Sequence, residues 1–178
     1  MTLGIAYGGA VGTVTYVDEL RSECDIDQSP TGTDVPLTVI FGDAQGGPTD
    51  NVALDAGGVI SINLTGFYSI QFKAQYGRSG AAGTSWIYFR TMVAFDGVNF
   101  IQPAGSTLTK ITNSNEDQSI TERALLELQQ GWKLKVEIMR GSEGNDSGGL
   151  IATVPAEGTW MTSFSSEVTV QRVVWVPS

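Results

Sequence analysis

Apolar and polar residues alternate strictly between residues 66 and 76, and this is the clearest pattern in the chain. One side of the alternation carries Tyr68, Ile70, Phe72, Ala74 and Tyr76, and the other carries Phe67, Ser69, Gln71, Lys73 and Gln75. A period of two residues is typical of a β-strand that buries one face in a core. The segment is long for a strand, so we expect it to belong to a large sheet.

Further segments with strand-like patterns follow one another along the chain, separated by links rich in Gly, Asn, Asp and Pro. The predicted strands span residues 35–41, 59–64, 85–95, 98–101, 132–140, 150–154, 159–164 and 167–176. Residues 119–129 fit both periods, and their composition favours a helix. The short link ending at Gly131 favours a hairpin with 132–140, so we predict a strand there too. The sequence therefore predicts an all-β antiparallel sandwich or jelly roll.

The segment 85–95 is apolar on both of its faces. One face carries Trp86, Tyr88, Met92 and Ala94, and the other carries Ile87, Phe89, Val93 and Phe95. A strand that is buried on both sides needs a second covering surface, which another copy of the chain could supply. We therefore predict a trimer interface at Ile87, Phe89, Val93 and Phe95. An aromatic platform for carbohydrate at Trp86, Tyr88, Phe89 and Phe95 is the alternative interpretation, and the continuous two-faced strand favours a core or subunit interface instead.

Residues 1–34 differ from the rest, because they are Gly-rich, then acidic, and carry no sustained period. We predict that they form a docking arm, separate from a jelly-roll domain at 35–178, and held by a partner's surface. The apolar residues expected to make that contact are Leu3, Ile5, Tyr7, Val11, Val14 and Tyr16.

Charge argues against two classes of partner. The chain of 178 residues has a net charge of −9, from 10 basic and 19 acidic residues, so phosphate backbones and anionic membranes repel it. No apolar run approaches the length that spans a bilayer, and the first residues lack the basic start of a secretory signal. A single cysteine, Cys24, allows no intrachain disulfide, which suits synthesis in a reducing cytoplasm.

Catalytic chemistry is also disfavoured, because the chain contains no histidine. This removes the usual general base and the commonest zinc ligand, so we expect neither an enzyme nor a cofactor. Calcium stays possible, since acidic side chains supply oxygen ligands, although their spacing matches no known calcium loop and favours solvated turns. The acidic candidates are Asp43, Asp50, Asp55, Glu116, Asp117, Glu143 and Asp146.

Three motifs between residues 59 and 176 resemble the TNF/complement-q-like jelly roll. They are Ile62-Asn63-Leu64-Thr65-Gly66-Phe67-Tyr68, the apolar strand that turns at Asp96-Gly97, and the hairpin Leu126-x-Leu128-x-x-Gly131-x-x-Leu134. The chain departs from the family pattern before its last strand, where Ser163-Phe164-Ser165-Ser166-Glu167 lacks the usual glycine.

The resemblance implies a homotrimer, and trimeric jelly rolls of this kind occur as decoration proteins and head fibres of bacteriophages. We therefore expect a structural virion protein, made in the host cytoplasm, that decorates the outer capsid surface. Residues 1–34 would bind the major capsid protein and stabilise the shell. The alternative is a receptor- or glycan-binding head of a fibre or spike. A glycan depolymerase would need paired carboxylates in a groove, and no spacing marks such a pair.

Overall fold

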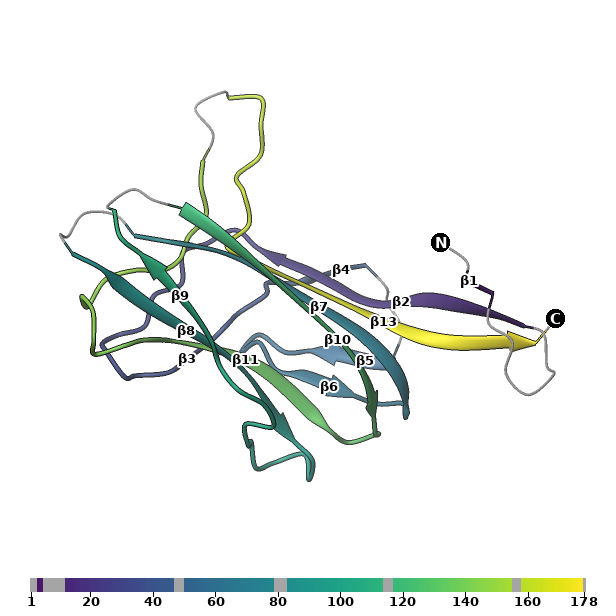
Figure 1. Cartoon of the computed structure of the whole chain (residues 1–178). Coiled ribbons are helices and arrows are strands. Elements are labelled where there is room, and N and C mark those ends of the chain that lie inside the picture. Colours follow the sequence, from purple (N-terminus) through teal and green to yellow (C-terminus); the bar gives the residue numbers. More distant parts are fainter. Residues whose placement is uncertain are drawn as a thin grey trace.

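The computed structural model describes residues 3–4, 12–46, 50–78, 83–113, 117–154 and 158–177. Within these ranges all regular structure is β, arranged as two antiparallel sheets that face each other (Figure 1). The strands are β1 Leu3–Gly4, β2 Gly12–Cys24, β3 Leu37–Thr38, β4 Ala44–Gly46, β5 Val52–Leu54, β6 Ile60–Ile62, β7 Gly66–Gly77, β8 Ser85–Ala94, β9 Thr107–Ile111, β10 Asp117–Leu128, β11 Lys133–Arg140, β12 Gly149–Leu150 and β13 Ser166–Pro177.

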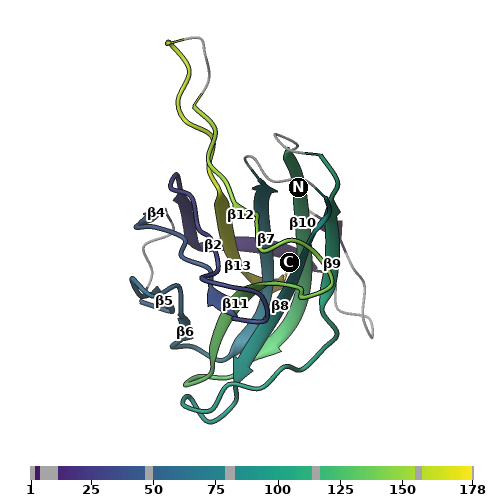
Figure 2. The same ribbon diagram turned by 90° about the vertical axis from the view of Figure 1, so that its left-hand side faces the viewer.

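The strand order shows jelly-roll connectivity, because neighbours within a sheet are distant in sequence. One sheet has the order β1-β2-β13-β7-β10, with β4 beside β2 and β12 beside β7. The other has the order β5-β6-β11-β8-β9, with β3 beside β11. The chain therefore crosses repeatedly from one sheet to the other, as the two views of the ribbon show (Figures 1 and 2). This confirms the predicted all-β antiparallel sandwich.

The ambiguous segment 119–129 is a strand, as predicted. It forms most of β10, which pairs with β7 from Asp117–Gly77 to Leu128–Gly66. This long pairing overrides the helical propensity of the segment. Other predicted strands are shorter or absent: 98–101 contributes only a bridge between Ile101 and Val93, and 159–164 contains no strand.

The core lies between the two sheets and is rich in aromatic side chains. The ring of Phe72 lies 5.9 Å from that of Phe41 and 6.2 Å from that of Phe89, which also packs on Tyr76 at 5.7 Å. Such tilted and edge-to-face pairs are the favoured aromatic geometries. The hydroxyl of Tyr68, whose side chain is fully buried, donates to the carbonyl of Leu64 at 2.6 Å. The inner face of β7 thus lines the interior, as its alternation predicts.

Residues 12–34 do not form an arm separate from the sandwich, which corrects the predicted division at 34/35. Strand β2 pairs with β13 along its whole length, from Gly12–Pro177 to Cys24–Ser166. The sequence conceals this strand because the pairing register shifts at the bulge between Val170 and Gln171. Glu19 is the extra residue there, and it breaks the alternation by which a strand is recognised.

Glu19 lies fully buried at the bulge in a polar cluster. Its carboxylate accepts hydrogen bonds from the Arg172 guanidinium at 2.7 Å and from the Asn51 amide at 3.1 Å. Burial raises the pKa of the nearby Tyr68 hydroxyl, and the charge of Glu19 raises it further. Paired charges of this kind can remain ionised in a low-dielectric interior.

The far ends of β2 and β13 extend past the sandwich. Strand β13 pairs with β7 only as far as Val173–Phe67, so residues 12–15 and 174–177 continue as a ribbon, to which β1 adds a short pairing with β2 at Thr13 and Val14 (Figure 1). The ring of Trp175 lies directly against Gly12, where an added Cβ would come within 2.4 Å of it. Only glycine allows this close approach. We call residues 12–15 and 174–177 the terminal ribbon.

Candidate interaction surface

The outward face of the larger sheet carries a row of exposed apolar side chains. Tyr16 pairs with Val173, and Val173 pairs with Phe67, so the three side chains stand side by side across β2, β13 and β7. Leu125, on the neighbouring strand β10, lies beside them opposite Ser69. The exposed fraction is 53% for Phe67 and 63% for Leu125. We call Tyr16, Val173, Phe67 and Leu125 the apolar row.

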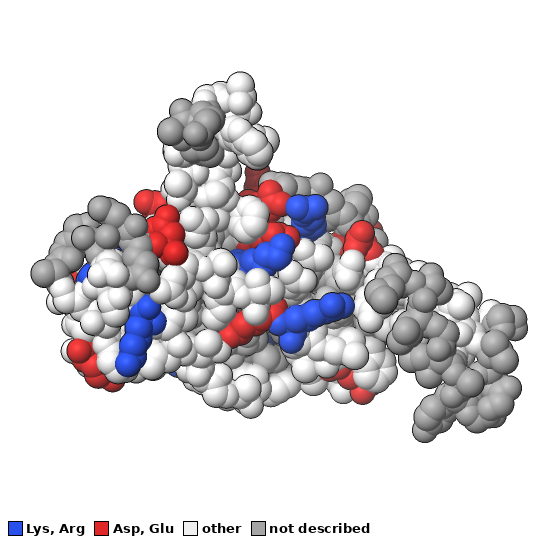
Figure 3. Space-filling view, turned by 45° about the horizontal axis from the view of Figure 1, so that its top comes forward, with Lys and Arg blue, Asp and Glu red and all other residues white. Residues whose placement is uncertain are grey.

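Two ion pairs compensate part of the charge on this face. Lys73 forms an ion pair with Glu167 at 3.0 Å, and Arg21 forms one with Glu23 at 2.7 Å. Basic and acidic side chains lie next to each other in the space-filling view (Figure 3). Glu127, which pairs with Phe67 across the strands, forms no ion pair with another described residue. A partner that covered this face would therefore need to match that charge as well as the apolar row.

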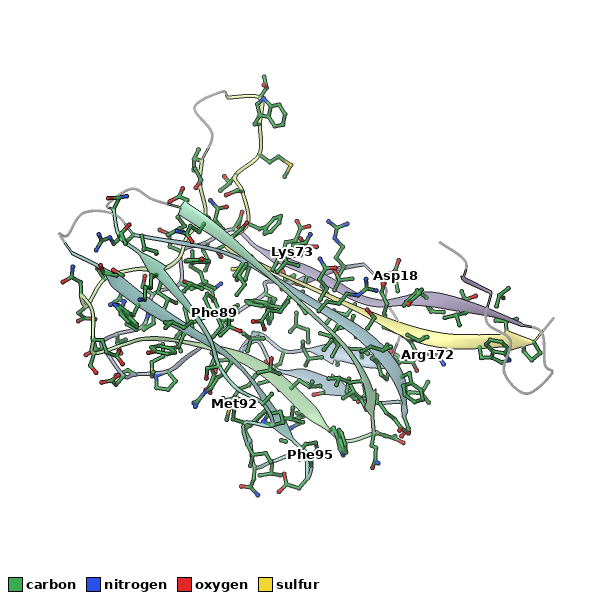
Figure 4. The ribbon with its side chains drawn as sticks, in the orientation of Figure 1. Asp18, Lys73, Phe89, Met92, Phe95 and Arg172 are labelled. Carbon is green, nitrogen blue, oxygen red and sulfur yellow. The ribbon has the colours of Figure 1, made fainter. Side chains whose placement is uncertain are left out.

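The apolar row lies near the same end of the sheet as the polar cluster of Glu19, Arg172 and Asn51, and further polar side chains surround the row. The Arg123 guanidinium lies 5.9 Å from the ring of Tyr16 and donates to Ser69 at 3.0 Å. Gln171 donates to Asp18 at 2.6 Å on the same side (Figure 4). These contacts hold the polar side chains in place around the row.

A projection that we call the finger, residues 151–154 and 158–164, rises from the same outward face. At its base the amide of Ser163 donates to the carbonyl of Thr153 at 2.9 Å. The side chain of Gln75 bonds to both residues, at 3.1 Å to the Thr153 hydroxyl and 3.0 Å to the Ser163 hydroxyl. Gln75 belongs to the outward set of β7, so the finger is fastened to the outer face and extends away from the body (Figures 1 and 2).

An apolar pocket of about 120 Å³ opens between the two sheets beside β10. Its interior is formed by Ile60, Ile70, Phe72, Leu134 and Val168, and its outer part by Thr91, Glu122, Arg123, Ala124, Leu126, Lys135 and Val136. Leu126 is 39% exposed and so connects the pocket with the surface.

The predicted interface on β8 is corrected by the structure. Ile87, Phe89 and Val93 lie inside the sandwich, where the opposite sheet of the same chain buries them. Phe95 is partly exposed and packs edge-on against Trp132 at 4.6 Å. Figure 4 shows Phe89 between the sheets and Phe95 near one end of the molecule. The burial of these residues therefore requires no second copy.

The other face of β8 is partly covered by the neighbouring strand β9 and by the loop 141–148 of the same chain. Lys110 of β9 places its ammonium 3.9 Å from the centre of the Trp86 ring, and the Tyr88 hydroxyl donates to Glu143 in the loop. Trp86 and Tyr88 thus lie on the opposite face of the strand from Phe89, so these aromatic residues do not share one exposed platform. The alternation of β8 does not reveal this cover, because it depends on how β9 and the loop fold back onto the strand.

The residues predicted for the docking arm fall into two groups. Val14 and Tyr16 lie on β2, and the backbone of Leu3 pairs with Val14. Ile5, Tyr7 and Val11 lie outside the described residues. Tyr16 is thus the one predicted docking residue that belongs to the apolar row.

The acidic candidates for calcium are engaged in other contacts where the structure describes them. Asp55 accepts backbone hydrogen bonds from Gly57 and Val59, and Asp146 pairs with Arg140 at 3.0 Å. Among the described residues, no group of three or more acidic or cysteine side chains is placed to hold a metal. Glu116 lies outside them. The same ranges contain no helix long and apolar enough to cross a membrane.

Comparisons with known proteins show the fold. No protein-family model and no curated protein matches the sequence. Among solved structures, the chain is similar to Eiger TNF from S. frugiperda, with a TM-score of 0.57 and 13% identity over 89% of this chain and 93% of that one. It is also similar to murine APRIL, with a TM-score of 0.53 and 11% identity over 89% and 99% of the two chains.

A third similar structure, the globular domain of zebrafish complement 1qA protein, has a TM-score of 0.49 and 15% identity over 86% of this chain and 94% of that one. At the identities of Eiger TNF and murine APRIL, likeness shows the fold alone. The chain therefore has a TNF-like jelly-roll fold, as its motifs predict.

Proposed function

We propose that this protein is a structural virion protein, a homotrimeric jelly roll that decorates the outer surface of a bacteriophage capsid. The observation that carries the self-association is the apolar row of adjacent side chains on the outward face of the larger sheet. The resemblance of the sequence motifs to trimeric virion jelly rolls motivates the capsid as the partner. This role requires no catalysis and no bound cofactor.

The apolar row is suited to a contact between copies. Exposed apolar side chains that adjoin one another mark interaction sites more often than scattered ones do. Burial of a side chain such as Phe67 or Leu125 contributes about 1.5–3 kcal/mol, so the row could supply much of the free energy of assembly. The two ion pairs on the same face reduce the repulsion between acidic copies.

The terminal ribbon is the proposed contact with the major capsid protein. It extends beyond the sandwich, and its Trp175 and Val176 are both more than one-third exposed. A ribbon that projects from the body can reach the shell while the trimer stands outside it. Three ribbons per trimer would bind several capsid subunits together and turn a weak single contact into a durable one.

A capsid-binding experiment tests the proposal. Capsids stripped of this protein are mixed with the intact chain and with the variant Trp175→Ser/Val176→Ser, and bound protein is measured by co-sedimentation. We expect the intact chain to bind and the variant to bind at least about tenfold more weakly. Removal of residues 1–34 is unsuitable, because it would delete β2 from the sheet.

Val98→Ser is the matched control, because Val98 is also exposed but lies near the turn after β8. It should bind as the intact chain does. Equal binding by the ribbon variant would show that the ribbon is not the docking element. Failure of the intact chain to bind would overturn the capsid proposal.

A further inference from the structure

The finger ends in apolar side chains that its own chain leaves uncovered. Met161 is 91% exposed, Trp160 is 74% exposed and Val154 is 75% exposed. Methionine and tryptophan rarely stand so far from a core. Residues 151–154 and 158–164 contain no charged residue, in a chain of net charge −9. The finger therefore offers a partner an uncharged projection.

We propose that the finger clasps a neighbouring copy of this chain and inserts Met161 into the pocket beside β10 of that copy. The inference rests on the self-association proposed above and names a second contact within it. Trp160 would close the pocket from outside. The clasp would thus supply residues from one copy to a site on the next.

The position of the finger favours a second copy as its occupant. Gln75 fastens the finger to the outward face of β7, the strand that also carries Phe67 of the apolar row. A copy that covered the apolar row would therefore stand on the same side of the sheet as the finger. The finger would reach the flank of that copy without any change in the fold of the sandwich.

Pocket and finger also match in size and polarity. A cavity of about 150 Å³ holds a benzene molecule, so a pocket of about 120 Å³ suits one unbranched side chain. Methionine adapts well to irregular apolar gaps. The deep part of the pocket is aliphatic and aromatic throughout, as at Ile70 and Leu134.

The contact is heterologous, because the finger and the pocket lie on different parts of the chain. Contacts of this kind form a closed ring when the rotation between copies closes. A three-fold ring would use every finger and fill every pocket. The clasp therefore agrees with a trimer and would not on its own produce a two-fold dimer.

Disulfide trapping tests the clasp in the full-length chain. In a Cys24→Ala background, Met161→Cys is combined with Leu126→Cys, because Leu126 borders the pocket. A disulfide forms only when the two Cα atoms approach within about 7 Å. We expect mild oxidation to produce linked dimers and trimers on a denaturing gel, and light scattering before oxidation to show a trimer.

Single-cysteine variants and a displaced cysteine provide the controls. Met161→Cys alone and Leu126→Cys alone should give no linked species, and neither should Val98→Cys combined with Leu126→Cys. Linkage by Met161→Cys alone would mean that fingers pair with fingers, and equal linkage by the Val98→Cys pair would mean random collision. Either result would overturn the clasp.

Mass and linkage together separate this inference from the proposed function. A trimer without linkage in the Met161→Cys/Leu126→Cys variant overturns the clasp and leaves self-association intact. A chain that stays monomeric at high concentration overturns both. Met161→Ser provides an independent measure. The dissociation constant of the trimer should be about ten- to a hundredfold higher than in the parent if the Met161 side chain is buried in the contact. Unchanged dissociation contradicts the clasp.

Discussion

The two faces of β7 arise from one alternating sequence, but one face is buried and the other is largely exposed. The inward side chains, such as Tyr68 and Phe72, are buried against the opposite sheet, whereas Phe67 on the outward face is more than half exposed. The difference lies in what stands opposite each face, since none of the described residues forms a layer over the apolar row on the outward face of the larger sheet. The exposed row is therefore where a partner would contribute most.

Strand β8 shows the other half of this comparison. It is apolar on both faces, yet one face belongs to the core and the other is partly covered by β9 and the loop 141–148 of the same chain. Two-sided apolarity thus identified a buried strand and not an interface. The more informative sign was a small number of exposed apolar residues on a face that is otherwise polar.

Truncation of a side chain on the core-facing side is expected to have the largest effect on stability. Phe89→Ala should lower the free energy of unfolding by about 3–5 kcal/mol, because it leaves a cavity among Phe72 and Tyr76. Urea denaturation followed by tryptophan fluorescence measures this loss. The matched variant Phe67→Ala removes the same ring from the outward face and should change monomer stability by less than about 1 kcal/mol. Equal losses would erase the distinction between the two faces.

The buried polar cluster should respond nearly as strongly. Arg172→Met removes the guanidinium that pairs with Glu19 at 2.7 Å, so the carboxylate stays buried with weaker compensation. We expect a loss of about 3 kcal/mol, at the low end for breaking a buried ion pair, because Arg172 is itself partly exposed. The double variant Glu19→Gln/Arg172→Met should recover part of this loss. A single variant as stable as the parent would contradict the role given to the pair.

The apolar row is expected to affect assembly more than folding. Phe67→Ser should weaken self-association at least about tenfold, measured by sedimentation equilibrium, because a buried ring is lost from each contact. Gln71→Ser changes a polar residue on the same strand face and should leave association nearly unchanged. If Phe67→Ser associated as the parent does, the row would not be the contact.

A smaller effect, a dependence of stability on pH, is expected from Glu137 in the other sheet. Burial disfavours ionisation of Glu137, but hydrogen bonds and charges from Lys135 and Arg90 outweigh it and lower the pKa of this carboxyl below 4.5. Because the folded pKa is depressed, the stabilisation is complete above the unfolded value and is lost as the pH falls through the folded value. Thermal melts between pH 6 and pH 3 should therefore fall less steeply for Glu137→Gln than for the parent. Parallel curves would assign the acid sensitivity to other groups.

Some features of the fold follow from short stretches of sequence. The alternation of 66–76 identifies β7 and its inner face. The link at Gly131 marks a turn, but the hairpin predicted there is wrong, because β10 and β11 lie in different sheets and the turn carries the chain from one sheet to the other. Asp96 marks a tight turn, where hydrogen bonds from the backbone of Asn99 and Val98 lower the pKa of its carboxyl to about 2. These features depend on neighbours in sequence, so local chemistry reveals them.

The candidate surface could be predicted only in part. The sequence predicts a docking role for Tyr16, which stays a prediction, and does not single out Val173, Phe67 or Leu125, because each adjoins polar residues on its own face of the strand. Their alignment depends on the register among β2, β13, β7 and β10. The exposed tip of the finger was also missed, since the pattern of 159–164 resembles a short strand.

The sequence by itself determined the class of structure, the long central strand and the side of it that faces a core. Only the tertiary structure decided that β2 belongs to the sheet, that β8 is covered by its own chain and that the apolar row and the finger stand exposed. The physical reason is that alternation records which side of a strand avoids water. It does not record which layer, from the same chain or from another, lies over that side.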